Sequence, residues 1–68
     1  MALIYQILES KAAERGLSRK KMCAALDISP DLYAQKRGGN SMLTVDQLYS
    51  VAKWLGYSME TVYDLERS

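Results

Sequence analysis

The sequence predicts an all-α fold, a compact five-helix domain that comprises the whole of residues 1–68. Apolar residues recur at three- and four-residue spacing, which is the period of amphipathic helices. Serines, a threonine and glycines mark the ends of the helical segments, and the short connections between them leave no room for a sheet. So short a chain can form only one thin core, and a homodimer is one way to stabilise it.

The first two predicted helices are separated by Gly16 and Ser18. Gly16 suits a left-handed residue just after a helix, and Ser18 is an N-cap for a short second helix that Asp27 closes. The apolar face of the first helix consists of Leu3, Ile4, Ile7, Leu8 and Ala12. The inward residues of the second are Met22, Cys23 and Leu26, and we expect Cys23 to be a small core residue rather than a nucleophile.

The third predicted helix begins at Ser29, a second N-cap followed by Pro30 in the first helical position. Ile28 and Tyr33 are spaced to form a hydrophobic staple, so Tyr33 is expected in the core. The helix should run to about Arg37, where the loop Gly38-Gly39-Asn40-Ser41 stops it.

The last two predicted helices begin at Thr44 and Ser58. Thr44 and Gln47 have the form of a capping box. The inward stripe that follows consists of Val45, Leu48, Val51, Ala52 and Leu55, up to Gly56. The final short helix should bury some of Met59, Val62, Tyr63 and Leu65.

The residue types present exclude several classes of protein. The single cysteine excludes an intramolecular disulfide framework, and without histidine the usual metal-ligand sets cannot form. A general base would have to come from carboxylates with no paired spacing, so we expect neither catalysis nor a cofactor. No stretch approaches the ~20 apolar residues of a membrane span, and Met1 to Leu8 lack the features of a signal peptide. We expect a cytoplasmic protein with no membrane partner and no small-molecule ligand.

The charges are distributed unevenly although the net charge is only +1. Residues 11–37 contain seven basic side chains against three acidic ones, a balance of +4. From Gly38 onward two basic residues face four acidic ones, a balance of −2. The basic segment is either a solvated face or a surface for an anionic partner.

The second and third predicted helices are joined by only about three residues, Asp27-Ile28-Ser29. So short a turn forces the helices to cross steeply, which is the geometry of a helix-turn-helix. The major groove of DNA is wide enough to admit one helix while the preceding helix crosses the backbone. The spacing therefore points to double-stranded DNA as the partner.

Three segments resemble the Cro/phage-repressor-like (lambda-repressor-like, XRE-type) helix-turn-helix family. Gly16-Leu17-Ser18 resembles that family's GLS, residues 26–29 resemble its LGIS turn, and residues 51–58 resemble its IAKALGVS, without a gap over roughly 16–63. The family usually has glutamine at Arg19, glycine at Asp27, an aliphatic residue at Lys36, an acid at Arg37 and proline at Leu43. Asp27 tolerates a left-handed conformation, so the fold is expected to survive that change.

Several polar side chains are predicted to contact DNA phosphates. Arg19, Lys20 and Lys21 occupy the first turn of a helix, where the macrodipole disfavours cations by ~0.3–1 kcal/mol each, and a phosphate would compensate both the charges and the free amides. Lys36 must lay its stem against the core and lift its ammonium to water, or turn toward phosphate. Arg37 is expected either to contact the DNA backbone or to stabilise the C-terminal end of its own helix. The full predicted set is Ser18, Arg19, Lys20, Lys21, Lys36, Arg37, Asn40 and Ser41.

The resemblance implies that the outward residues at the start of the third helix read base edges. Gln35 can pair with adenine, and Asp31 can accept from cytosine or simply stabilise the helix dipole. The set is Ser29, Pro30, Asp31, Ala34 and Gln35, which promises few strong base contacts.

Aromatic and methionine residues of the last two helices exceed what five short helices can bury. They are typical of interface cores, and repressors of this kind bind two half-sites as two-fold dimers. The predicted dimer interface consists of Trp54, Tyr57, Met59, Tyr63 and Leu65, although Trp54 and Tyr57 can also simply cover the core.

The resemblance implies a sequence-specific transcriptional regulator. We expect a small phage-type or mobile-element repressor that acts as a dimer on an operator, at the nucleoid of a bacterial or phage-infected cell. The alternative is a protein-interaction module on the same fold, an antitoxin or antirepressor. Weak base readers and Lys36 favour that alternative, whereas the basic start of the second helix opposes it.

Overall fold

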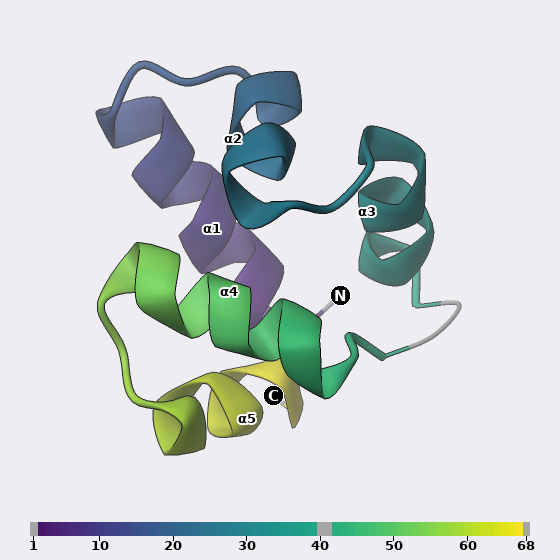
Figure 1. The fold of residues 1–68 in the computed structure, drawn as a ribbon, viewed down its shortest axis with the longest axis vertical. Coiled ribbons are helices and arrows are strands. Elements are labelled where there is room, and N and C mark those ends of the chain that lie inside the picture. Colours follow the sequence, from purple (N-terminus) through teal and green to yellow (C-terminus); the bar gives the residue numbers. More distant parts are fainter. Residues whose placement is uncertain (1, 40–41, 68) are drawn as a thin grey trace.

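The computed structural model describes residues 2–39 and 42–67, and five α-helices account for most of them (Figure 1). They are α1 (Leu3–Glu14), α2 (Arg19–Leu26), α3 (Pro30–Arg37), α4 (Val45–Leu55) and α5 (Met59–Arg67). No strand occurs in these residues, so the predicted all-α fold and its five helices are confirmed. No helix of the described residues is both long and apolar enough to cross a membrane.

The helix boundaries follow the capping residues. The side chains of Ser18, Ser29 and Ser58 each accept a hydrogen bond from the backbone amide three residues later, at 3.2–3.3 Å. Thr44 and Gln47 form the reciprocal capping box, in which each side chain bonds the backbone amide of the other. The N-termini of these four helices could be predicted from the sequence, because a cap is a contact between near neighbours in the chain.

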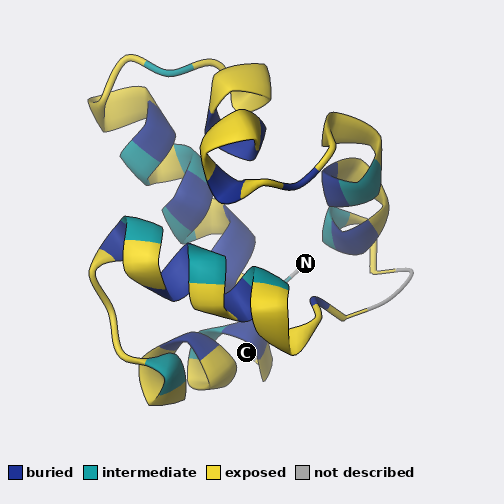
Figure 2. Cartoon of the chain, viewed as in Figure 1, coloured by how far each residue is buried: buried dark blue, intermediate teal, exposed yellow. Residues whose placement is uncertain are grey.

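The hydrophobic core lies between α1, α4 and α5, and α2 closes one side of it (Figure 2). Fifteen buried apolar side chains form one cluster to which every helix contributes. The predicted stripe of α4 is confirmed at Leu48, Val51, Ala52 and Leu55, but Val45 is 63% exposed. Val45 is the first residue of α4, so it stands at the end of the inward stripe.

The helix-turn-helix consists of α2, the turn 27–29 and α3. Asp27 has φ 59° and ψ 41°, the left-handed conformation that the turn requires at this point. Within the described residues α3 makes its main helix contact with α2, so it stands at the side of the molecule (Figure 1). Tyr33 anchors it: its ring is 1% exposed and meets the ring of Tyr5 edge to face, with centroids 5.7 Å apart. Ile28 is also buried.

Candidate nucleic-acid interface

The outer face of α3 presents the predicted base-reading residues together. Pro30, Asp31, Ala34 and Gln35 are exposed, whereas Tyr33 and Lys36 on the same helix face inward. Ser29 is also exposed, but its hydroxyl oxygen already accepts the amide of Leu32 at 3.2 Å. An exposed helix joined to a preceding helix by a three-residue turn has the shape required to enter a major groove.

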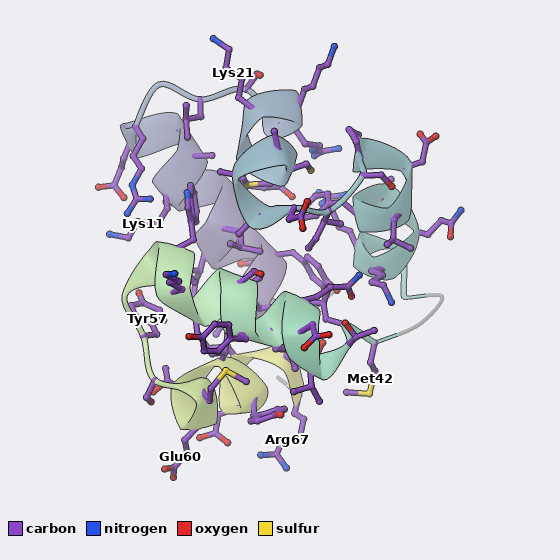
Figure 3. All side chains as sticks on the ribbon, viewed as in Figure 1. Lys11, Lys21, Met42, Tyr57, Glu60 and Arg67 are labelled. Atoms are coloured by element: carbon purple, nitrogen blue, oxygen red, sulfur yellow. The ribbon has the colours of Figure 1, made fainter. Side chains whose placement is uncertain are left out.

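The start of α2 forms a second part of this surface. Lys20 and Lys21 are exposed, and Lys21 projects into solvent (Figure 3). Ser18 caps the amide of Lys21, but the amides of Arg19 and Lys20 have no partner in the described part of the chain. Open amides at a helix N-terminus beside two ammonium groups favour an anionic oxygen.

Glu9 of α1 connects α2 and α3 through three side chains. Its carboxylate accepts from the Arg19 guanidinium at 3.1 Å, from Arg37 Nε at 2.7 Å and from the Tyr33 hydroxyl at 2.8 Å. Arg19 also lies over the Tyr33 ring, 5.7 Å from its centroid. This cluster, the Glu9 hub, holds both helices of the helix-turn-helix to α1.

The electrostatics of the Glu9 hub favour the ionised carboxylate. Partial burial opposes ionisation, but the hydrogen bonds from Tyr33, Arg37 and Arg19 outweigh it and hold the pKa of Glu9 below its ordinary value. Burial, together with the hydrogen bond to Glu9, raises the pKa of the Tyr33 phenol well above its ordinary range. Tyr33 therefore donates to a charged acceptor at any physiological pH.

The hub changes the interpretation of the two arginines predicted to contact phosphate. From the charge pattern alone, a phosphate is the expected anionic partner of Arg19. In the structure, the Glu9 carboxylate is that partner. Arg37 is likewise paired and only 36% exposed at its side chain. Glu9 was missed because its partners lie 10, 24 and 28 positions away in the chain. The sequence feature that could have indicated a role for Glu9 is its position on α1, directly after the buried Leu8.

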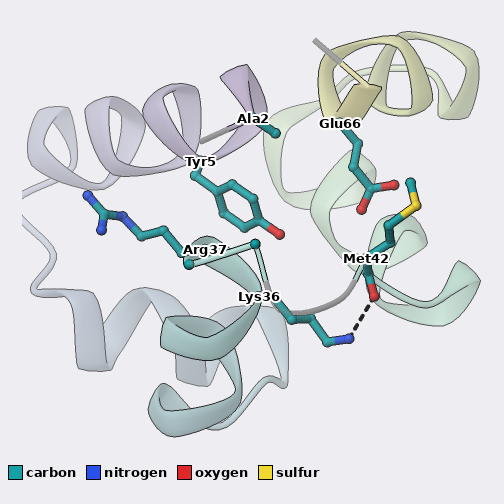
Figure 4. Close-up of a pocket in the computed structure, with 8 residues that line it drawn as sticks. Ala2, Tyr5, Lys36, Arg37, Met42 and Glu66 are labelled. Carbon is teal, nitrogen blue, oxygen red and sulfur yellow. Dashed lines mark hydrogen bonds between the residues drawn. The ribbon is translucent and has the colours of Figure 1, made fainter.

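Lys36, also predicted to contact phosphate, lies inside the molecule instead. It is 8% exposed, and its ammonium donates to the carbonyl of Met42 at 2.7 Å (Figure 4). It lines a cavity of about 290 Å³ together with Tyr5, Arg37 and Glu66. The stem packs as predicted, but the ammonium reaches a backbone carbonyl rather than bulk water or the exposed face of α3, because the chain folds back beneath α3 at Met42. Asn40 and Ser41, the other two predicted contacts after α3, lie outside the described residues.

The predicted dimer residues divide into two groups. Trp54, Met59 and Leu65 are partly buried and pack against the core. The Arg15 guanidinium covers the Trp54 ring at 4.4 Å and also donates to the Trp54 carbonyl at 3.3 Å. Tyr57 and Tyr63 remain 37% exposed. Three large apolar side chains that the prediction omitted are far more exposed, at 60–63%: Met42, Val45 and Tyr49.

The described residues contain no group of three or more acidic or cysteine side chains placed to hold a metal ion. Cys23 is fully buried, as predicted, and burial raises the pKa of its thiol. No family model, curated protein or solved structure matches the chain.

Proposed function

We propose that this protein binds double-stranded DNA and regulates transcription, as a small repressor that occupies an operator as a dimer in the cytoplasm. The observation that carries the proposal is the helix-turn-helix itself, with an exposed α3 beside an α2 N-terminus that combines open amides with Lys20 and Lys21. The three segments that resemble the lambda-repressor-like family favour the same function.

In this proposal α3 enters the major groove and α2 lies across the phosphate backbone. Lys20, Lys21 and the open amides of the first turn of α2 hold a phosphate group, which fixes the register of α3 on the duplex. Gln35 pairs with an adenine edge, and Ala34 and Pro30 contact thymine methyl groups. The Glu9 hub keeps α2 and α3 at a fixed distance from α1, so both contacts form without rearrangement.

The test is a binding titration of duplex genomic fragments at two or more salt concentrations. The affinity should fall steeply with salt, with a slope of about 0.9 per neutralised phosphate. Removing both lysines, as Lys20→Ala with Lys21→Ala, should lower that slope by about 2 for each bound copy, or about 4 for the dimer. Lys11→Ala removes the same kind of charge from α1, where Lys11 pairs with Glu14 at 3.7 Å, and should leave the slope unchanged.

Gln35→Ala should alter sequence preference while leaving the salt slope in place, because a base contact neutralises no phosphate. A protein that forms no salt-sensitive complex at micromolar concentration would overturn the proposal.

A protein-interaction module on the same fold is the second candidate, and one observation favours it. Arg19, Arg37 and Lys36 all bond within the chain, so the basic surface is smaller than the sequence charge suggests. An antitoxin or antirepressor would use the exposed face of α3 against another protein. Absence of salt-sensitive DNA binding, together with capture of one protein that Gln35→Ala abolishes, would establish this alternative.

A further inference from the structure

The cavity beneath the end of α3 gathers buried polar side chains from three helices. Tyr5 of α1, Lys36 of α3 and Glu66 of α5 all line it, and its volume is about 290 Å³ (Figure 4). Each of these three residues is at most 9% exposed. The volume lies near the lower end of the roughly 300–1,000 Å³ that is typical of small-molecule sites. The cavity therefore has the size and the polar groups that a small ligand requires.

Lys36 and Glu66 hold the two sides of a single peptide group. The Lys36 ammonium donates to the Met42 carbonyl at 2.7 Å, and the Glu66 carboxylate accepts from the Leu43 amide at 2.9 Å. This carbonyl and this amide belong to the same peptide bond, and in a trans peptide they point in opposite directions. A positive and a negative charge are thus fixed on opposite sides of one peptide at the wall of the cavity, where neither can swing out to bulk water.

Two polar atoms at the cavity form no hydrogen bond within the described part of the chain: the Tyr5 hydroxyl and the second carboxylate oxygen of Glu66. Among the described residues no fully buried side-chain nitrogen or oxygen lacks a partner, so both atoms must reach open space. The Tyr5 hydroxyl points into the space between Lys36, Met42 and Glu66 (Figure 4). Burial and the negative charge of Glu66 raise the pKa of the Tyr5 phenol, which therefore stays neutral. Both oxygens can accept an N–H group of a ligand.

The charges around the cavity select a ligand that carries both signs. Arg37 also lines it, but its guanidinium points away from the Tyr5 hydroxyl and donates to Glu9 at 2.7 Å (Figure 4). The remaining charges are those of Lys36 and Glu66, which cancel. A simple anion would meet Glu66 and a simple cation would meet Lys36, whereas a zwitterion satisfies both.

We propose that this cavity binds an α-amino acid with a short apolar side chain, whose ammonium donates to Glu66 and the Tyr5 hydroxyl and whose carboxylate lies beside Lys36. The oxygen and nitrogen of an α-amino acid are separated by two carbon atoms, a spacing similar to that of the peptide oxygen and nitrogen that Lys36 and Glu66 span. Lys36 contributes its charge without giving up its bond to Met42. Ala2, Met42 and the Tyr5 ring supply an apolar wall for the ligand side chain.

This inference goes beyond the proposed function, because the cavity lies behind the exposed face of α3 and uses none of the predicted base-reading residues. It also corrects the expectation of a protein without a small-molecule ligand. That expectation rests on local motifs, and such motifs do not show that positions 5, 36 and 66 meet. A ligand that contacts α1, α3 and α5 at once should raise Tm in proportion to its occupancy.

The first experiment is isothermal titration calorimetry of the full chain, without DNA, against alanine, valine, leucine and methionine. At least one should bind with a Kd of about 1 mM or tighter. Isobutylamine and isovalerate are valine without its carboxylate and without its ammonium, and each should bind at least about tenfold more weakly than valine. β-Alanine, whose charges are one carbon further apart, should likewise bind more weakly than alanine. Absence of binding by all four amino acids overturns the site, and an amine that binds as tightly as valine overturns the role of Lys36.

The second experiment uses variants that remove one recognising group. Tyr5→Phe deletes only the hydroxyl, which bonds to no described residue, so the fold should be retained while affinity falls about three- to tenfold. Tyr63→Phe is the matched control, since Tyr63 does not line this cavity.

Glu66→Gln keeps an oxygen for the Leu43 amide but removes the charge, and it should weaken binding at least about tenfold. Glu60→Gln, an exposed acid on the same helix, should have no effect. Circular dichroism checks that each variant is folded. A folded Tyr5→Phe protein that binds as tightly as the wild type overturns the assigned geometry.

The outcome is separable from that of the proposed function, because the calorimetry contains no DNA. Amino-acid binding without any salt-sensitive DNA complex supports this site and refutes the DNA-binding proposal. DNA binding by a protein that takes up none of the amino acids does the reverse.

Discussion

Replacing Glu9 by glutamine removes the charge that Arg19, Arg37 and Tyr33 share while keeping the size of the side chain. The two arginine pairs are partly exposed, at 48% and 36% of the arginine side chains, so each is worth about 0.2–1 kcal/mol. The glutamine oxygen can still accept from Tyr33, although a neutral acceptor binds less strongly than a carboxylate. We expect Glu9→Gln to lower the free energy of unfolding by about 1–2 kcal/mol.

Thermal or urea unfolding followed by circular dichroism measures this loss. For a domain of this size, 1 kcal/mol corresponds to about 4–8 °C in Tm. Glu14→Gln is the control, since Glu14 is an exposed acid on the same helix with a 3.7 Å pair to Lys11, and its effect should be within about 0.5 kcal/mol.

The pH dependence gives a sharper check. The pKa of Glu9 is lower in the folded protein than its ordinary value of 4.5, so its contribution to stability is present above that pH. The contribution is lost as the pH falls through the folded pKa, because the folded carboxyl must then be protonated. The difference between wild type and Glu9→Gln should therefore be full at pH 7 and shrink in acid. An equal difference at both pH values, or none at pH 7, would refute the role assigned to the hub.

Two further substitutions test local conclusions. Asp27→Gly should raise the unfolding free energy by about 0.5–1 kcal/mol and Asp27→Ala should lower it by a similar amount, because φ is 59° there; urea unfolding that gives both the same sign would contradict the backbone argument. Lys36→Met should leave the salt slope of DNA binding unchanged and alter stability by less than about 1.5 kcal/mol, since it retains the buried stem; a flatter slope would show that Lys36 reaches a phosphate.

The parts of the structure that could be predicted from the sequence depend on contacts between near neighbours. Ser18, Ser29 and Thr44 cap amides three residues away, so spacing alone locates the starts of α2, α3 and α4. The inward faces of the helices follow from the 3.6-residue period for the same reason. Val45 shows the limit of that rule, because periodicity assigns a residue to a face but does not say how far the neighbouring helix extends.

The Glu9 hub and the position of Lys36 could not be predicted, because both depend on segments that are distant in the chain. Glu9 meets Arg37 only after α1 and α3 have been placed by the core. Lys36 reaches Met42 only because the chain returns under α3 after the loop. The charge pattern of a sequence shows which residues are basic. It does not show which of them already bond to an acceptor within the folded chain.

The number of basic side chains already engaged within the chain affects how strongly the protein could bind DNA in the proposed function. Most of the seven basic residues between positions 11 and 37 are engaged within the chain: Lys11 with Glu14, Arg15 on Trp54, Arg19 and Arg37 with Glu9, and Lys36 with Met42. Lys20 and Lys21 form no ion pair in the described part of the chain. If only these two neutralise phosphates, each copy contributes a salt slope near ~2, which is small for an operator-binding protein.

The dimer of the proposed function doubles that slope. A monomeric form of the protein should bind duplex DNA with about half the slope of the dimer, because the phosphate contacts of one copy are lost. A wild-type slope well above ~4 would mean instead that Arg19 and Arg37 leave Glu9 when DNA binds. Glu9→Gln would then strengthen DNA binding while it weakens the fold, since both arginines would be released in advance.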